Sequence, residues 1–127
     1  MNLLNISKSM ILFMFLTACQ SVPARAPDVG LVLAGDGLRP PNSDLRIDFG
    51  RAEPGVIAAV SKLMAQDFTN RNSVAGCGDL VRWSDDIELT FITGNFRGWA
   101  AKPERFFNAN GVFQSRPDGW VFAGKTC

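Results

Sequence analysis

The sequence predicts an α+β domain in which one amphipathic helix packs on an antiparallel β-meander sheet, so that helix and sheet form two layers. One segment carries apolar residues at helical spacing. Three later segments alternate apolar and polar residues, and short turns separate them. A helix with one apolar stripe and a sheet with one apolar face can bury these surfaces against each other, which is a stable way to build a small domain.

The helix is predicted from Pro54 to about Ala65. Pro54 suits the first helical turn, where the missing backbone N–H of proline costs nothing. Apolar residues then recur at i, i+1, i+4, i+7 and i+8, at Val56, Ile57, Val60, Leu63 and Met64. This spacing gives one apolar stripe along the helix.

Six short segments have the composition of strands, namely residues 31–34, 45–49, 80–83, 87–93, 96–100 and 120–123. Leu45, Ile47 and Phe49 alternate with polar residues, which predicts that all three face the core. Tight turns at 84–86 and 94–95 join three of the later segments into an antiparallel meander.

The segments between these strands are expected to be turns and loops. Residues 35–37 and 39–42 are rich in glycine and proline and are predicted to form turns. Residues 70–78 are predicted to be a polar loop that carries Cys77. Residues 101–118 contain several breakers and are predicted to be irregular.

The first eighteen residues have the layout of an export signal. Lys8 gives a positive start, and residues 10–16 are apolar and uncharged. This run is too short for a membrane-spanning helix, which takes about 20 residues. It ends in Leu16-Thr17-Ala18-Cys19, an aliphatic residue, two small residues and a cysteine. This ending resembles the lipobox of bacterial lipoproteins.

That resemblance implies a signal peptide over residues 1–18, cleavage before Cys19 and a lipid on its sulfur that anchors the chain to a membrane of the bacterial cell envelope. Gln20 stands where an Asp favours retention in the inner membrane of enterobacteria, so the outer membrane is favoured. Residues 19–30, with their prolines, are expected to be a flexible tether, and residues 31–127 one small α+β domain.

The two other cysteines are expected to pair. Cys77 and Cys127 form an even set in an exported chain, which predicts a disulfide. Closing a loop of about 50 residues contributes roughly 4 kcal/mol in the chain-entropy model. The alternatives are two free thiols or a reactive Cys77.

The composition excludes several classes of function. The chain has no histidine, which removes the commonest general base and zinc ligand. Lys8 is the only charged residue before Cys19, so the remaining basic residues equal the 12 acidic ones. Without a basic excess we expect no nucleic acid partner. We also expect no enzymatic activity, no cofactor and no metal.

Two groups of residues remain as candidate sites. Asp85, Asp86 and Glu88 form the densest acidic cluster, to be interpreted either as a cation or acid–base site or as a hydrophilic turn with Glu88 facing solvent. Three aromatic residues are candidates for a partner surface, namely Trp99, Phe106 and Phe107. Strand alternation predicts that Trp99 faces away from Phe96, and burial of the two phenylalanines is the alternative for that pair.

A helix led by glycine over Gly50–Met64 and a meander over Trp83–Trp99 resemble small envelope lipoproteins of the BamE/SmpA kind. Phe49-Gly50-Arg51-Ala52, Val81-Arg82-Trp83 and Phe96-Arg97-Gly98-Trp99 are also similar to uncharacterised lipoproteins of alphaproteobacteria. The lipid anchor, the balanced charge, the missing catalytic residues and the aromatic residues of the sheet predict a membrane-anchored, non-enzymatic binding or structural module with an envelope protein as partner. The alternatives are a small enzyme or ligand binder, using the acidic cluster or an aromatic cleft, and a periplasmic inhibitor.

Overall fold

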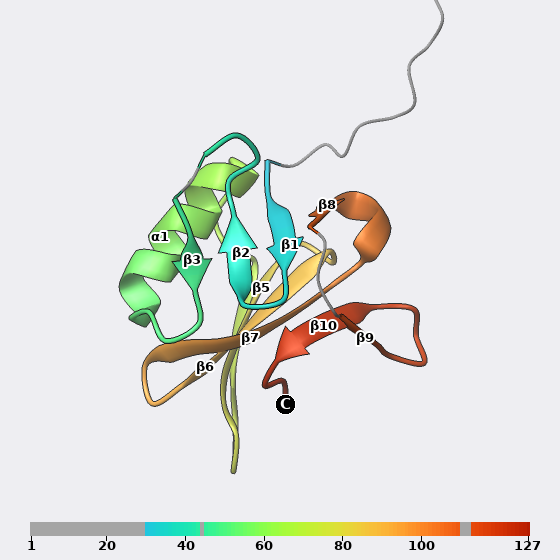
Figure 1. The fold of residues 1–127 in the computed structure, drawn as a ribbon. Helices are drawn as coiled ribbons and strands as arrows, with labels where there is room; N and C mark the ends of the chain where they lie inside the picture. Colours follow the sequence, from blue (N-terminus) through green and yellow to red (C-terminus); the bar gives the residue numbers. More distant parts are fainter. Residues whose placement is uncertain (1–29, 44, 110–112) are drawn as a thin grey trace, which may run out of the picture.

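The computed structural model describes residues 30–43, 45–109 and 113–127 and contains one helix and ten strands (Figure 1). The predicted α+β class is confirmed, with sheet as the dominant element. The predicted signal peptide, Cys19 and the tether up to residue 29 lie outside the described residues. In chain order the elements are β1 (Val32–Ala34), β2 (Gly37–Arg39), β3 (Ile47–Asp48), α1 (Glu53–Met64), β4 (Asn70–Val74), β5 (Gly78–Trp83), β6 (Ile87–Ile92), β7 (Asn95–Ala101), the 3₁₀ turn η2 (Pro103–Arg105), β8 (Phe107–Asn108), β9 (Gln114–Ser115) and β10 (Val121–Gly124).

The strands form two sheets, where the sequence suggested one. The smaller sheet has the order β3-β2-β1-β8, and the larger has the order β4-β5-β6-β7-β10-β9. Strand β1 pairs with β8 in parallel, and the other pairs are antiparallel. The predicted meander is confirmed as β5, β6 and β7, which are consecutive neighbours in the larger sheet.

Helix α1 and the smaller sheet cover the same face of the larger sheet, so the molecule has two layers (Figure 1). The indole N–H of Trp83 donates to the hydroxyl of Ser61 on α1 over 3.2 Å. The indole N–H of Trp99 donates to the carbonyl of Ala34 on β1 over 2.9 Å. Both tryptophans lie on one face of the larger sheet because their partners on β6 are two residues apart.

The core lies between these layers. Val56, Val60 and Met64 of α1 are buried, whereas Ile57 and Leu63 are only partly buried. The apolar stripe of α1 is therefore wider than the part of the helix surface that the larger sheet covers. Large side chains that are fully buried fill the rest of the core, namely Leu31, Leu33, Leu38, Trp83, Ile87, Leu89, Phe91, Phe96, Trp99 and Phe106.

Two predictions about the smaller sheet are wrong. Gly37 and Arg39, predicted to belong to two turns, lie in strand β2, which pairs with β1 across the two-residue turn at 35–36. Leu45 does not face the core, because β3 begins only at Ile47 and the Leu45 side chain is 73% exposed. The alternating pattern thus extends further along the chain than the strand does.

Residues 70–78 form most of a β-hairpin rather than the predicted loop. Strand β4 pairs with β5 from Asn70 opposite Arg82 to Val74 opposite Gly78. The side chains of β4 are exposed up to Ser73. An edge strand without an apolar face gives no alternating signal, so the sequence pattern could not show it. Residues 101–118, predicted to be irregular, likewise contain η2, β8 and β9.

A β-bulge in β7 overturns the prediction that Trp99 and Phe96 face opposite ways. Thr90 lies opposite Gly98, and Phe91 lies opposite Phe96, so Arg97 is an extra residue in β7. A bulged residue shifts the alternation of the strand that contains it. Phe96 and Trp99 therefore both face the core, and both are 0% exposed.

Candidate functional site

The structure places Trp99 in the core and not on a partner surface, so that prediction is wrong. The indole is hydrogen-bonded to Ala34 and packs edge-on against Phe113, with ring centroids 5.3 Å apart. This residue joins the two sheets. Its high burial follows from the bulge at Arg97, which turns it inward.

The adjacent phenylalanines point different ways. Phe106 is 2% exposed and belongs to the core, so it is not available as a partner surface. Phe107 is 38% exposed on the short strand β8, at the edge of the smaller sheet. Only Phe107 of the three predicted aromatic residues is therefore accessible.

The acidic cluster does not converge on one point. Ser84, Asp85 and Asp86 form the turn between β5 and β6, and Asp86 lies 3.5 Å from the Arg105 guanidinium. The Glu88 carboxylate accepts a hydrogen bond from Arg82 over 2.6 Å. Within the described residues, no group of three or more cysteines and carboxylates is placed to hold a metal ion.

Glu88 also differs from its predicted solvent-facing position. It is 9% exposed, although it lies on the outer face of the larger sheet. Its cross-strand pair with Arg82 compensates the buried charge, because a carboxylate out of water needs a cation or several hydrogen bonds. The pair links β5 to β6, so Glu88 and Asp86 contact different cations and do not face each other as an acid–base pair.

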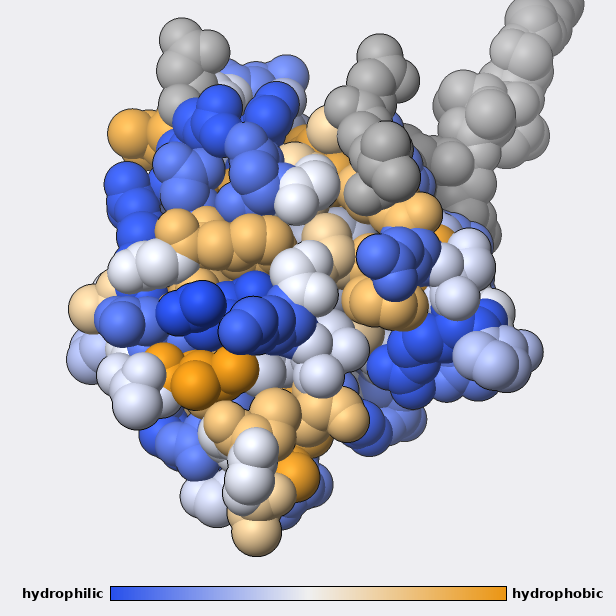
Figure 2. All heavy atoms as spheres, turned by 60° about the horizontal axis from the view of Figure 1, so that its bottom comes forward, coloured by the Kyte–Doolittle hydropathy of each residue, from blue (hydrophilic) through white to orange (hydrophobic). Residues whose placement is uncertain are grey.

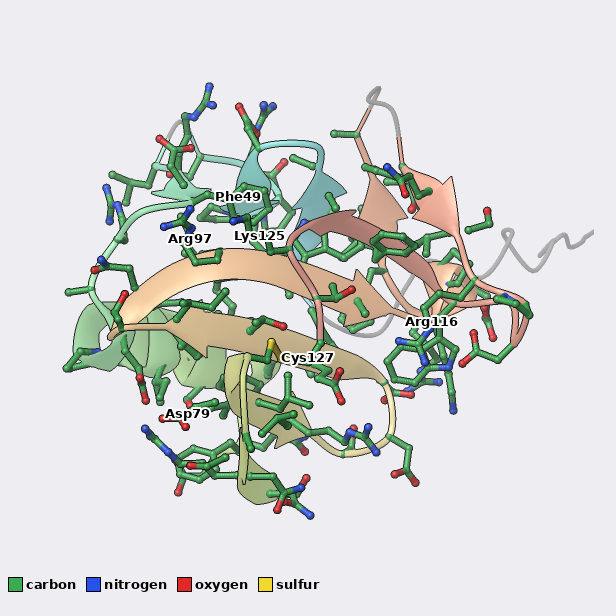
Figure 3. All side chains as sticks on the ribbon, turned by 90° about the horizontal axis from the view of Figure 1, so that it is seen from below. Phe49, Asp79, Arg97, Arg116, Lys125 and Cys127 are labelled. Atoms are coloured by element: carbon green, nitrogen blue, oxygen red, sulfur yellow. A yellow bond between two sulfur atoms is a disulfide. The ribbon has the colours of Figure 1, made fainter. Side chains whose placement is uncertain are left out.

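The predicted disulfide between Cys77 and Cys127 is confirmed, with Cα atoms 5.9 Å apart. It joins the turn of the β4–β5 hairpin to the end of the chain (Figure 3). Between β10 and Cys127, the backbone N–H of Lys125 donates to the Arg97 carbonyl over 2.9 Å. The two cysteines thus fix the C-terminal segment across the outer face of the larger sheet.

A groove of about 360 Å³ lies between α1, β3 and the segment that leads into β3. This α1 groove, as we call it, has a volume within the range of small-ligand sites. Its lining consists of Pro40, Ser43, Leu45, Arg46, Ile47, Arg51, Ala59, Lys62 and Leu63.

The α1 groove follows from local geometry on both of its sides. Ala59 and Leu63 are four residues apart, so they lie on one face of α1, beside the stripe that the larger sheet covers. Opposite them, β3 pairs with β2 along one edge only and forms the edge of the smaller sheet. The backbone N–H of Leu45 donates to the Ser43 hydroxyl, which shapes the segment at the rim.

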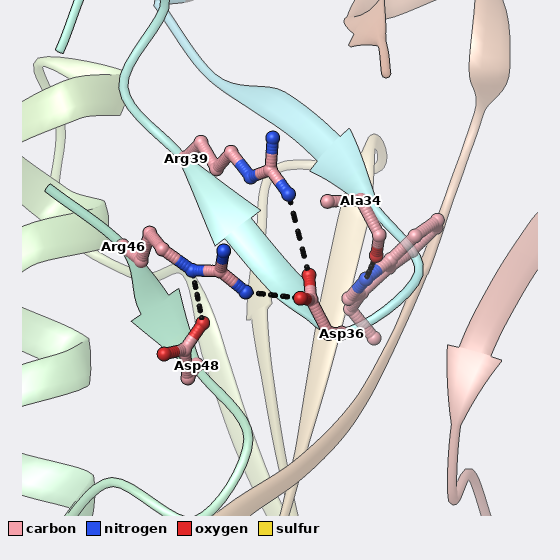
Figure 4. Close-up of polar contacts among 6 residues, drawn as sticks. Ala34, Asp36, Arg39, Arg46 and Asp48 are labelled. Carbon is pink, nitrogen blue, oxygen red and sulfur yellow. Dashed lines mark hydrogen bonds and ion pairs between the residues drawn. The ribbon is translucent and has the colours of Figure 1, made fainter. Parts of the chain in front are cut away.

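The described lining of the α1 groove contains three cations and no carboxylate. Arg46 is fixed by two neighbours, since it donates to Asp48 over 2.9 Å and also contacts Asp36 (Figure 4). The hydrogen bond with Asp48, followed by the attraction of Asp36, raises the pKa of Arg46 above its ordinary value.

Arg51 and Lys62 differ from Arg46. Across residues 30–43, 45–109 and 113–127, neither of them forms an ion pair. Both side chains belong to exposed residues on the rim. Asp44, which is next to Leu45 in sequence, lies outside the described residues. The groove therefore combines an apolar floor with two cations whose charge no described side chain compensates.

A second hollow of about 420 Å³ lies on the outer face of the larger sheet, lined by Leu80, Glu88, Arg116, Phe122, Thr126 and Cys127. Beside it, the guanidinium of Arg116 lies 5.2 Å from the centre of the Trp120 ring. Here the cation is already paired, since Arg116 contacts Asp118 over 2.7 Å. This hollow therefore attracts a charged ligand less than the α1 groove does.

Arg97 and Lys125 also form no ion pair within the described part of the chain. They lie close together, beside Phe49, on the side seen from below in Figure 3. Neither residue lines the two hollows. On the face that Figure 2 presents, apolar residues form small groups between hydrophilic ones, as is usual for a solvated surface.

Sequence reasoning missed the α1 groove because it assigned Leu45 to the core and all of the helix stripe to one sheet. The signal that could have found it is the width of the stripe, since Ala59 and Leu63 extend it beyond what one sheet face covers.

Among the described helices, α1 has 12 residues and none is long enough to cross a membrane. Comparisons of this chain with family models, with curated proteins and with solved structures find no match.

Proposed function

We propose that this chain is the precursor of a bacterial envelope lipoprotein, anchored through a lipid on Cys19, whose domain is a non-enzymatic module that binds another envelope component in the α1 groove. The observation that carries the binding role is the composition of this groove, an apolar floor with cations and no described carboxylate. The anchor rests on the lipobox-like Leu16-Thr17-Ala18-Cys19.

The disulfide supports export of the domain. A structural Cys77–Cys127 bond forms and persists in oxidising compartments such as the bacterial periplasm. The domain would then lie on the outer side of the inner membrane, and the outer membrane is the favoured site of the anchor.

A role as a binding module agrees with how the charged residues are used. Asp86 and Glu88 are paired with different cations and stabilise the larger sheet, so they offer no shared site for chemistry. The α1 groove, in contrast, presents the exposed side chains of Leu45, Arg51 and Lys62, which take no part in the core. Binding at such a site uses apolar contact for affinity and a few charges for orientation.

The anchor is tested by expressing the full chain and its Cys19→Ala variant in bacteria supplied with labelled palmitate. We expect label on the wild-type protein and none on the variant. Label on the variant, or its absence from both proteins, would refute the anchor.

The binding site is tested by placing a photoreactive residue at Leu45 and, as a control, at Phe107. Both side chains are exposed, but only Leu45 lines the α1 groove. We expect Leu45 to cross-link to an envelope component in intact cells, and Phe107 to give little product. Equal products from both positions would contradict the assignment of the groove.

A further inference from the structure

We infer that the α1 groove docks on an anionic lipid surface, that of the membrane to which the chain is tethered. This inference rests on the proposed lipid anchor and identifies the component that the groove contacts. Three observations carry it: the place where the tether joins the domain, the exposure of Leu45 and two cations that form no ion pair with a described residue.

The tether joins the domain at one end of the α1 groove. A Cβ atom placed on Gly30 would lie 3.7 Å from the carbonyl oxygen of Leu63 and 3.8 Å from the Pro41 ring. Leu63 and Pro40 both line the groove. Figure 1 shows the start of β1, the loop between β2 and β3 and the C-terminal end of α1 at the same end of the molecule.

The length of the tether keeps this end near the membrane. Cys19 and Gly30 are eleven residues apart in sequence. Such a segment spans at most about 40 Å when it is fully extended, and a domain of this size has a radius of gyration of about 13 Å. A lipid on Cys19 therefore holds the groove within roughly one domain diameter of the headgroups, which raises its local concentration at the surface.

The groove has the chemistry of an interfacial membrane contact. Leu45 projects with 73% of its surface exposed, beside the half-buried Leu63. Binding to a membrane surface has two contributions. Exposed aliphatic side chains insert at the level of the headgroups, and nearby cations attract anionic lipids. Arg51 and Lys62 supply the cations, and within the described residues no acidic group offsets them.

An acidic apolar peptide is the other occupant that this chemistry would accept. The lipid surface is favoured because Gly30, where the tether joins the domain, lies beside the groove and keeps the groove within reach of the anchored membrane. Strand β3, at the groove edge, has only two residues, which offers little backbone for an added strand to pair with.

The test uses the mature chain, residues 19–127, with Cys19→Ser so that no lipid is attached. This chain contains every described element. It is mixed with vesicles of phosphatidylcholine alone, and with vesicles that also contain phosphatidylglycerol, and the bound fraction is measured by sedimentation. We expect binding to the anionic vesicles only, and weaker binding as the salt concentration rises.

Two double variants, matched in their change of charge, locate the contact. Arg51→Gln with Lys62→Gln is expected to weaken partitioning about fivefold for each cation removed. Arg97→Gln with Lys125→Gln removes two other cations that form no ion pair with a described residue and do not line the α1 groove, and should leave partitioning unchanged. Thermal unfolding of each variant shows whether its fold is intact.

Equal loss in the two double variants, or no binding to anionic vesicles, would overturn the inference. Cross-linking of Leu45 to a protein in cells, with no lipid adduct, would also overturn it in favour of a peptide. These results are distinguishable from failure of the anchor, because palmitate labelling of Cys19 is measured on the full chain and does not depend on the groove.

Discussion

Replacing Trp99 with Phe tests whether this residue joins the two sheets, as the structure indicates, or forms part of a surface that binds a partner. The change removes the N–H that bonds to the Ala34 carbonyl over 2.9 Å. Ala34 is also the partner of Gly37 across the β1–β2 turn, so the change removes one hydrogen bond, worth about 0.5–1.5 kcal/mol, without orphaning the carbonyl. The smaller ring also leaves a void beside Phe113, and the whole change should cost less than the roughly 3–5 kcal/mol of a Trp→Ala replacement.

We therefore expect Trp99→Phe to lower the free energy of unfolding by about 2 kcal/mol, a large share of the roughly 5–15 kcal/mol of a typical domain. Urea denaturation followed by far-UV circular dichroism measures this change. Trp120→Phe is the matched control, because Trp120 is only partly buried and stacks on Arg116, and its loss should cost less than about 1 kcal/mol. Equal costs for the two variants would refute the role of Trp99 as the link between the sheets.

Three further predictions concern the larger sheet. Reduction of the Cys77–Cys127 disulfide, whose cysteines are 50 residues apart in sequence, should lower the free energy of unfolding by up to about 4 kcal/mol, and an unchanged urea midpoint with reductant would contradict this. Gly98→Ala would place a Cβ 1.9 Å from the Lys125 carbonyl oxygen, so we expect the melting temperature to fall by at least about 4 °C, as measured by circular dichroism. The Ser73 hydroxyl, followed by Arg71, holds the pKa of Asp79 below its ordinary value, so the stability that Asp79 contributes should be present above about pH 4 and be lost as the pH falls toward the lowered pKa. Asp79→Asn should remove this part of the pH dependence of unfolding, and an unaltered pH profile would count against it.

The elements that the sequence predicts well are those with a buried face. Helix α1 begins and ends within one residue of its predicted bounds, because its stripe has a clear helical period. Strands β5, β6 and β7 are found because buried residues such as Val81 and Leu89 stand out from their neighbours.

The elements that the sequence pattern does not predict are held by polar contacts or by tertiary pairing. Strand β4 has no apolar face and is joined to β5 partly through Arg71 and Ser73, which both contact Asp79. The bulge at Arg97 depends on the register between β6 and β7, and strand alternation alone could not place Trp99 correctly.

The α1 groove could not be predicted for a similar reason. It arises where β3 and α1 meet across the fold, and its most exposed member, Leu45, carries the pattern of a core residue. The disulfide, in contrast, could be predicted because counting cysteines in an exported chain leaves one pair.

The role of the α1 groove is tested most directly by measuring how far Leu45 and Phe107 reach into a membrane. Each residue is replaced in turn by a cysteine that carries a fluorophore, in the anchored protein reconstituted into anionic vesicles with a quencher on the lipid chains. Phe107 lies on β8, at the opposite edge of the smaller sheet from β3. We predict strong quenching at position 45 and weak quenching at position 107. Equal quenching, or stronger quenching at position 107, would contradict docking through the α1 groove.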